Sequence, residues 1–315
     1  MKNHLLLYLK SFKKNPFIRL KLIKIIFISL LILIVIVFKK NLIKWYILKK
    51  EFECLVDKYK KLIISEKNIS DDSPIWMMWY QGINNAPPIV LSCIQSIIEN
   101  KANHSLILLD KFNLKNYIEL PSYITEKFKK KIFSITHYSD IIRMAILSKY
   151  GGYWIDSTYF ITSPIKRINN SFYTLKLSYC FKHPFIKCIW SGNFFAVPKN
   201  SFIATYSYYA FLYYWKKYNS LLDYFLIDYI ISIAYYNVPE FKNKIKKLPF
   251  VNCNIFYLAQ RLNSSYNESD FNCKFNKLNK SNNPVIINNN SKTNYGYIYE
   301  KYKFNITNNI TIFYN

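Results

Sequence analysis

The chain has 315 residues, of which 51% are hydrophobic and 19% aromatic, and its formal net charge is +26. This composition can build a sizeable core and excludes wholesale disorder. The positive charge favours anionic partners such as acidic lipid or a sugar nucleotide. Because no Arg-rich stripe or nucleic-acid motif accompanies the charge, we expect no nucleic-acid partner.

The N-terminal region contains an apolar run from Ile25 to Phe38, interrupted only by Ser29 and flanked by lysines. Extended back to Leu20, the run is close to the ~17–25 residues that cross a bilayer. We therefore predict a basic tail over 1–19, a transmembrane anchor over 20–38 and an amphipathic basic stem over 39–70. These segments predict a single-pass membrane protein that contacts membrane lipid.

Downstream of the stem, strand and helix patterns alternate. The predicted strands are 74–81, 105–109, 153–155, 173–180 and 192–197, and the predicted helices are 87–100, 122–131, the segment before Gly151, 201–218 and 221–237. This alternation predicts an α/β domain with a mainly parallel sheet. We assign this domain to residues 71–262 and leave 263–315 as an Asn- and Lys-rich C-terminal extension.

The segment from Asp140 to Asp156 carries the strongest chemical signal. Asp140 and Arg143 are three residues apart, which places them on one face of a helix. Gly151 and Gly152 then end that helix, because glycine reaches left-handed backbone angles. Asp156 follows a short buried strand, and strand ends are where open α/β sheets bind ligands. Taken alone, the Asp140–Arg143 pair is more often a surface ion pair of small energetic value.

Arginine is scarce in this lysine-rich chain. Of 44 basic residues only four are arginines: Arg19, Arg143, Arg167 and Arg261. An arginine kept beside Asp140 indicates a need for its planar, multi-donor guanidinium.

The segment SDIIRMAILSKYGGYWID (139–156) resembles the signature of glycosyltransferases with a DXD-type sugar-binding motif. This group includes capsular polysaccharide synthesis proteins, Och-type mannosyltransferases and glucosylating bacterial toxins, and the capsular type is the most similar. The segments IWMMWYQG (75–82), WSGNFFAVPKN (190–200) and LLDYFLIDY (221–229) support the resemblance, which covers residues 74 to about 249. One departure is that Asp156-Ser157-Thr158 replaces the Asp-x-Asp of the broader group, as in capsular-type members.

The resemblance implies a GT-A-like nucleotide-sugar-binding domain and a hexosyltransferase-like, metal-dependent enzyme of polysaccharide biosynthesis. Its substrates would be a nucleotide-sugar donor and a glycan or lipid-linked acceptor. A divalent cation, Mn²⁺ or Mg²⁺, would be held by Asp156 and Thr158 and would stabilise the departing diphosphate. Capsule-type enzymes use cytosolic sugar nucleotides, so the catalytic domain is expected on the cytoplasmic side.

The resemblance also implies roles for other residues. Asp140 and Arg143 would act with Asp156 in catalysis, by contacting the sugar or the phosphates. Substrate-binding positions would be Trp79, Gly151, Gly152, Asn193 and Asp228. His137, two residues before the signature, is expected to make a structural hydrogen bond rather than to contact the donor.

Two alternatives remain open. The chain could be a non-catalytic membrane-anchored sugar-binding protein. Less favoured is an aspartate-dependent phosphatase, because Thr158 stands where such enzymes need a second aspartate.

The six cysteines form no Cys-x-x-Cys motif and have no spacing typical of a zinc site, so we expect most of them to be small buried side chains.

Overall fold

The computed structural model describes residues 16–166, 168–178, 189–280 and 284–304. The chain divides into two units, residues 1–50 and 51–315. Helix α2 (Pro16–Tyr59) begins in the first unit and ends in the second.

The second unit is built on a five-stranded sheet in the order β2-β1-β3-β7-β5. Its strands are β1 (Ile75–Met78), β2 (Leu106–Leu109), β3 (Gly152–Ile155), β5 (Tyr173–Thr174) and β7 (Phe194–Val197). Strand β1 is parallel to β2 and β3, whereas β7 is antiparallel to β3 and β5. The α/β class is thus confirmed, but the sheet is mixed rather than mainly parallel.

The direction of each strand follows from its connection. Parallel neighbours need a long crossover, usually a helix. Helix α3 connects β1 to β2, and helices α4 and α5 connect β2 to β3. Between β3 and β7 the described residues contain only short strands, and β7 returns antiparallel.

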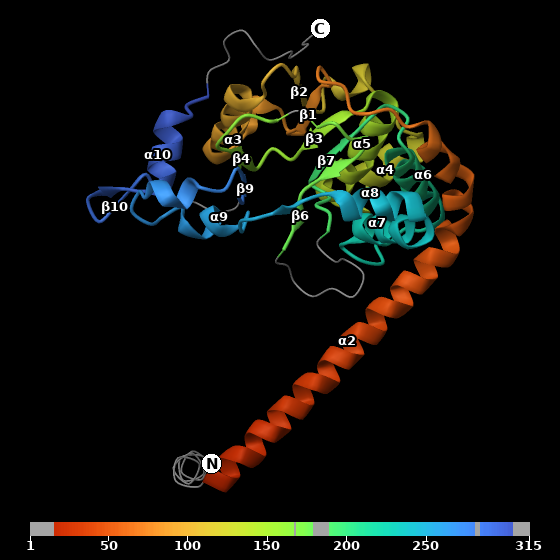
Figure 1. Ribbon diagram of the computed structural model, residues 1–315, viewed down its shortest axis with the longest axis horizontal. Coiled ribbons are helices and arrows are strands. Elements are labelled where there is room, and N and C mark those ends of the chain that lie inside the picture. Colours follow the sequence, from red (N-terminus) through yellow and green to blue (C-terminus); the bar gives the residue numbers. More distant parts are fainter. Residues whose placement is uncertain (1–15, 167, 179–188, 281–283, 305–315) are drawn as a thin grey trace. The chain divides into compact units, whose positions relative to one another are not determined.

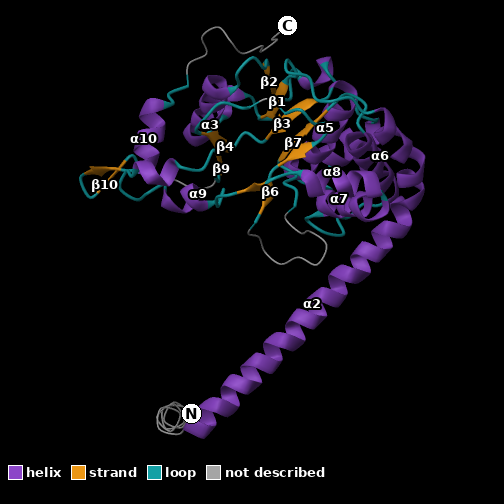
Figure 2. Cartoon of the chain, viewed as in Figure 1, coloured by secondary structure: helices purple, strands orange, loops and turns teal. Residues whose placement is uncertain are grey.

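Helices cover the sheet on both sides. The remaining helices are α3 (Pro88–Asn100), α4 (Ser122–Lys129), α5 (Ile135–Tyr150), α6 (Phe202–Lys217), α7 (Leu226–Asn237), α8 (Pro239–Lys247), α9 (Tyr257–Arg261) and α10 (Asn294–Lys301). Helices α3, α9 and α10 lie to one side of the strands, and α5 to α8 lie to the other (Figure 1; Figure 2). Short 3-10 helices are η1 (Lys60–Ser65), η2 (Ile83–Asn85), η3 (Leu114–Asn116) and η4 (Glu268–Phe271).

Alternating side chains of the sheet fill two layers of core, as the period of two along a strand requires. Ile75 and Met77 of β1 are fully buried in the cluster that includes α3 and the C-terminal elements. Trp76, the residue between them in the sequence, is also buried. Its Nε1 donates a hydrogen bond to the Gly151 carbonyl oxygen at 2.9 Å. The strands are therefore buried on both faces, which is why they read as apolar runs.

Three further two-stranded sheets complete the fold. They pair β4 (Tyr159–Ile161) with β9 (Phe275–Lys277), β6 (Lys176–Leu177) with β8 (Phe250–Val251), and β10 (Ile287–Asn288) with β11 (Ser291–Lys292). The β4–β9 pair brings the predicted C-terminal extension beside the strand that follows Asp156.

The predicted single-pass membrane localisation is wrong. Within the described ranges, no helix combines the length and the apolar character that a membrane crossing needs. In α2 the uncharged run from Ile25 to Phe38 lies between Lys24 and Lys39. At 1.5 Å per residue that run covers about 21 Å, less than the ~30 Å hydrocarbon core of a bilayer.

The amphipathic face of the predicted stem packs on protein. Phe52 and Val56 are buried, and Tyr59 stacks on Tyr209 of α6 with ring centroids 4.9 Å apart. Glu51 accepts hydrogen bonds from Lys217 at the end of α6. The C-terminal part of α2 is thus a component of the second unit.

The cysteine expectation needs one correction. Cys253 and Cys273 form a disulfide with Cα atoms 5.7 Å apart, while Cys93 is a free, buried thiol and Cys54 a free, exposed one. The sequence spacing did not indicate this disulfide, because Cys253 and Cys273 come together only when β9 pairs with β4.

Candidate functional site

Asp156 lies directly after β3, at the sheet edge where the parallel strands end. Its backbone N–H donates to the carbonyl oxygen of Asn193, just before β7, at 3.1 Å. The short β3, buried on all four residues, ends here and delivers the carboxylate to the edge of the sheet. The side chain is 26% exposed, so it is accessible from a cavity while most of its surface is covered.

Arg143 connects Asp156 to Asp140 through one partly buried and one buried ion pair. Its Nη1 donates to Asp140 Oδ1 at 2.8 Å and its Nη2 donates to Asp156 Oδ1 at 3.0 Å. The guanidinium carbon lies 5.3 Å from the Trp154 ring centroid, and Trp154 Nε1 also donates to Asp156 Oδ1 at 3.0 Å. The i,i+3 pair on α5 is thus buried, not a surface pair.

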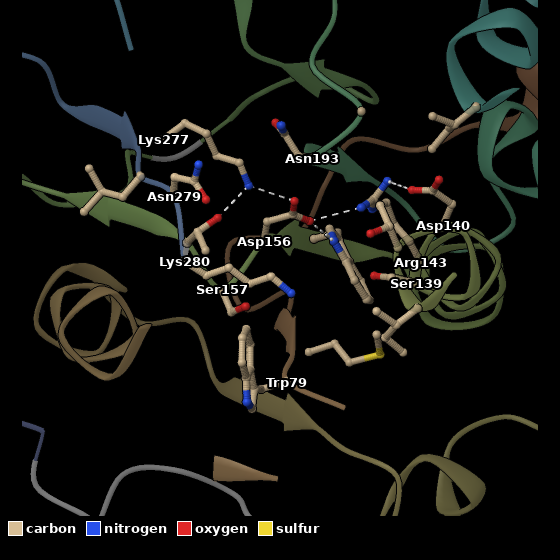
Figure 3. Close-up of a pocket in the computed structure, with 18 of the residues that line it drawn as sticks. Trp79, Ser139, Asp140, Arg143, Asp156, Ser157, Asn193, Lys277, Asn279 and Lys280 are labelled. Carbon is tan, nitrogen blue, oxygen red and sulfur yellow. Dashed lines mark hydrogen bonds and ion pairs between the residues drawn. The ribbon is translucent and has the colours of Figure 1, made fainter. Parts of the chain in front are cut away.

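Lys277 reaches Asp156 from the other side (Figure 3). Its Nζ donates to Asp156 Oδ2 at 2.9 Å and to Thr158 Oγ1 at 2.7 Å. The lysine belongs to β9, whose register places Lys277 opposite Tyr159 of β4. The result is a row of alternating charges: Asp140, Arg143, Asp156 and Lys277.

This row lines a cavity of about 850 Å³. Trp79 lies across the cavity from the row, with the Lys280 ammonium 5.6 Å from its ring centroid (Figure 3). Other lining side chains come from β1, α5, the loop before β7, α7 and the C-terminal segment, and include Ser139, Tyr224, Gln260 and Asn279. The size is within the range of small-molecule sites in proteins.

The environment separates the pKa values of the carboxyl groups around Arg143. Burial raises the pKa of Asp140 to about 7, even though Arg143 acts to lower it. Burial also acts to raise the pKa of Asp156, but Lys277 and Arg143 together outweigh it, and that pKa falls below its ordinary value. Asp156 is therefore ionised at neutral pH, whereas Asp140 can hold a proton there.

Asp228 and Asn193, for which substrate binding is predicted, also line the cavity. Asp228 Oδ1 accepts a hydrogen bond from Trp190 Nε1 at 3.0 Å, and burial raises the pKa of this carboxyl to about 6. Asn193 Oδ1 accepts from the Tyr159 hydroxyl at 2.7 Å. These contacts orient both polar groups at the cavity wall.

Gly151 and Gly152 are not among the residues that line the cavity. Both have positive φ, 71° and 95°, and the space beside each Cα is filled by backbone. A Cβ on Gly151 would lie 2.4 Å from the Lys199 nitrogen, and one on Gly152 would lie 2.3 Å from the Pro74 oxygen. The glycines allow the helix-to-strand turn to pack against neighbouring chain.

His137 makes structural contacts. Its ring nitrogens lie 2.9 Å from Ser134 Oγ and 3.3 Å from the Tyr224 carbonyl oxygen. It is buried at the start of α5 and does not line the cavity.

The residues predicted to hold a divalent cation do not fit one in this arrangement. The described residues contain no group of three or more His, Cys, Asp or Glu side chains placed to hold a metal. Mn²⁺ and Mg²⁺ prefer about six oxygen ligands. Both oxygens of Asp156 are engaged by protein donors, and the Lys277 ammonium takes the position between Asp156 and Thr158 where the ion would bind.

Sequence reasoning missed Lys277, Lys280 and the tryptophan partners Trp154 and Trp190. In a lysine-rich chain, the sequence gives no reason to single out one lysine as functional. A usable signal was Trp154, two positions before Asp156, since a buried indole N–H needs an acceptor.

The family described as capsular polysaccharide synthesis protein matches residues 33–302. An O-glycosyltransferase, braB, from Annulohypoxylon truncatum is 26% identical over 110 residues, which are 32% of this chain and 26% of that protein. The solved structure of PaToxG glycosyltransferase has a TM-score of 0.38 and 15% identity, over 65% of this chain and 83% of that one.

Proposed function

Because this chain belongs to the capsular polysaccharide synthesis protein family, we propose that it is a glycosyltransferase of polysaccharide biosynthesis. It moves a hexosyl group from a nucleotide-sugar donor to a hydroxyl of a glycan or lipid-linked acceptor. The family and the O-glycosyltransferase relative support the transferase class. The GT-A-like character of the domain is part of the proposal.

One observation carries the proposal: a cavity at the sheet edge holds an ionised carboxylate between two cations, opposite an aromatic ring. Asp156 between Arg143 and Lys277 suits a donor that presents both hydroxyls and a diphosphate. Trp79 offers a flat apolar face of the kind that packs against a nucleobase. The charges and the ring lie in the same cavity of about 850 Å³.

Each residue of the cavity has a role that follows from its chemical groups. Asp156 accepts hydrogen bonds from donor hydroxyls, and Arg143 donates to sugar or phosphate oxygens. Asp140, paired with Arg143 and almost fully buried, holds the guanidinium in place. Asn193 and Asp228, which line the same cavity, contact the transferred sugar.

In the reaction, the acceptor hydroxyl oxygen bonds to the anomeric carbon of the donor sugar. The bond from that carbon to the β-phosphate oxygen breaks, and its electron pair stays on the phosphate. The hydroxyl proton is released, and the products are the glycoside and a nucleoside diphosphate. Cationic groups lower the barrier because negative charge grows on the departing diphosphate.

The phosphatase alternative is less well supported. Such enzymes need a second aspartate two positions after the nucleophile, but Thr158 stands there and its hydroxyl accepts a hydrogen bond from Lys277. The non-catalytic sugar-binding alternative differs from the proposal only in turnover.

The test is a screen of nucleotide-sugars for hydrolysis and transfer, with Mn²⁺ and with chelator, since the predicted metal dependence remains a prediction. Asp156→Asn should lower turnover at least ~100-fold, the effect of losing about 3 kcal/mol of transition-state stabilisation. The control is Asp57→Asn, which removes an equal charge from an exposed pair with Lys60.

Each alternative has its own outcome. Near-normal turnover by a folded Asp156→Asn protein contradicts the assigned role. Donor binding without any turnover supports the binding protein, and a preference for simple phosphomonoesters supports the phosphatase.

A further inference from the structure

We propose that Lys277 is the built-in cation of this donor site, so that its ammonium, rather than a divalent metal ion, binds the donor's diphosphate. The inference rests on the proposed function and names one more catalytic residue for it. Its consequence is that nucleotide binding by this protein requires no metal.

The position of the ammonium is the first argument. Nζ lies 2.9 Å from Asp156 Oδ2 and 2.7 Å from Thr158 Oγ1, the two groups that the sequence offers as metal ligands. An ion bound by both oxygens would overlap the ammonium and be repelled by its charge. The Thr158 hydroxyl, a weak metal ligand in place of a carboxylate, is a good acceptor for an ammonium proton.

The second argument is that Lys277 is held in place along its length. Its backbone N–H donates to the Ile255 carbonyl oxygen at 2.7 Å, and the N–H of Leu278 donates to the Thr158 carbonyl oxygen at 2.9 Å. The ammonium lies 5.1 Å from the Tyr159 ring centroid. With 17% of its side chain exposed, Lys277 is part of the cavity wall and not a mobile surface lysine.

The third argument is the number of donors and charges. An ammonium has three N–H groups, and Asp156 and Thr158 accept two of them. The third can be given to a phosphate oxygen. Lys280 lines the same cavity, so the site has three cations, with Arg143, to bind the diphosphate beside the Asp156 carboxylate.

In the transfer step, Lys277 stabilises the oxygen that leaves the anomeric carbon. The electron pair of the broken C–O bond goes to the β-phosphate, and the ammonium donates a hydrogen bond to that phosphate without losing its proton. The diphosphate departs paired with Lys277, as it would depart paired with a metal ion.

The experiment measures binding of UDP, GDP, ADP and dTDP to the full chain by calorimetry, in chelator and in Mn²⁺. At least one nucleotide should bind in chelator, with an affinity that Mn²⁺ changes by less than about threefold, under 0.7 kcal/mol. Lys277→Ala should weaken that binding about 10- to 100-fold in chelator, the loss of one charge-assisted hydrogen bond.

The variant should also gain a metal site. Once Lys277→Ala removes the ammonium, Mn²⁺ can reach Asp156 and Thr158 and should restore part of the nucleotide affinity. The electron paramagnetic resonance signal of free Mn²⁺ should fall with the variant and not with the wild type. Lys60→Ala, which removes an exposed charge, is the matched control and should behave as wild type.

The outcomes separate this inference from the proposed function. Nucleotide binding by the wild type that appears only with Mn²⁺ overturns the inference and leaves the glycosyltransferase standing. No binding of any nucleotide under either condition overturns both. Because the wild-type comparison needs no variant, the inference stays testable if Lys277→Ala does not fold, and Lys277→Gln then serves as the uncharged variant.

Discussion

Replacing Arg143 by lysine should destabilise the protein although the charge is kept. Arg143 is 5% exposed and donates to both Asp140 and Asp156, at 2.8 and 3.0 Å. An ammonium on a shorter, non-planar side chain can hold one of these bonds. The other is lost, at about 1.5–3 kcal/mol for a charged hydrogen bond, together with ~1 kcal/mol of contact with Trp154.

The expected loss is therefore about 2.5–4 kcal/mol, a large part of the ~5–15 kcal/mol that stabilises a typical protein. Urea unfolding followed by tryptophan fluorescence measures it. Arg261→Lys is the matched control. Arg261 Nε lies 3.6 Å from Asp270 Oδ2 and its side chain is 46% exposed, so this replacement should cost less than ~1 kcal/mol.

Nucleotide affinity gives a second measurement on the same variants. Arg143→Lys should lose most of it, because the planar guanidinium is what orders the Asp156 carboxylate. The reasoning is refuted if Arg143→Lys and Arg261→Lys unfold at the same urea concentration and Arg143→Lys binds nucleotide as wild type does.

Three further predictions concern other parts of the domain. The pKa of Asp228 is raised from 3.8 to about 6, so the folded chain binds more protons than the unfolded chain in that window, and the free energy of unfolding should fall as pH rises through it. Asp228→Asn should remove that part of the pH dependence, and an unchanged slope in urea unfolding would contradict the assignment. Gly151→Ala should cost about 3 kcal/mol, because its Cβ would lie 2.4 Å from backbone at positive φ, whereas Gly192→Ala, with its nearest neighbour 3.7 Å away, should change the melting temperature little. Reducing the Cys253–Cys273 disulfide, with its sequence separation of 20, should cost about 3 kcal/mol and weaken nucleotide binding, and the double serine variant should be indifferent to reductant.

The signature helix and the strand after it were predictable because their information is local. Apolar residues at helical spacing mark α5, the two glycines mark its end, and four buried residues mark β3. Asp156 at the strand end follows from these elements alone. The family resemblance, which rested on the same segment, is confirmed by the match over residues 33–302.

The strand directions and the role of Lys277 were not predictable from local sequence. A strand buried on both faces, such as β7, reads the same in either direction, so the mixed sheet has no local signature. Strand β9 has three residues in an Asn- and Lys-rich segment, and it becomes a strand by pairing with β4. Only that pairing brings Lys277 close to Asp156 and Thr158.

The pairing of β4 with β9 also sets when the site can come into existence during synthesis. Lys277 follows Thr158 by 119 positions. At ~5–20 residues per second, the ribosome adds Lys277 about 6 to 24 s after Thr158. Throughout that interval the nascent chain carries Asp156 and Arg143 but not Lys277, the second cation that pairs with Asp156. A ribosome that stops before Lys277 therefore releases a polypeptide that lacks strand β9 and the ion pair between Lys277 and Asp156, however well its first strands have folded.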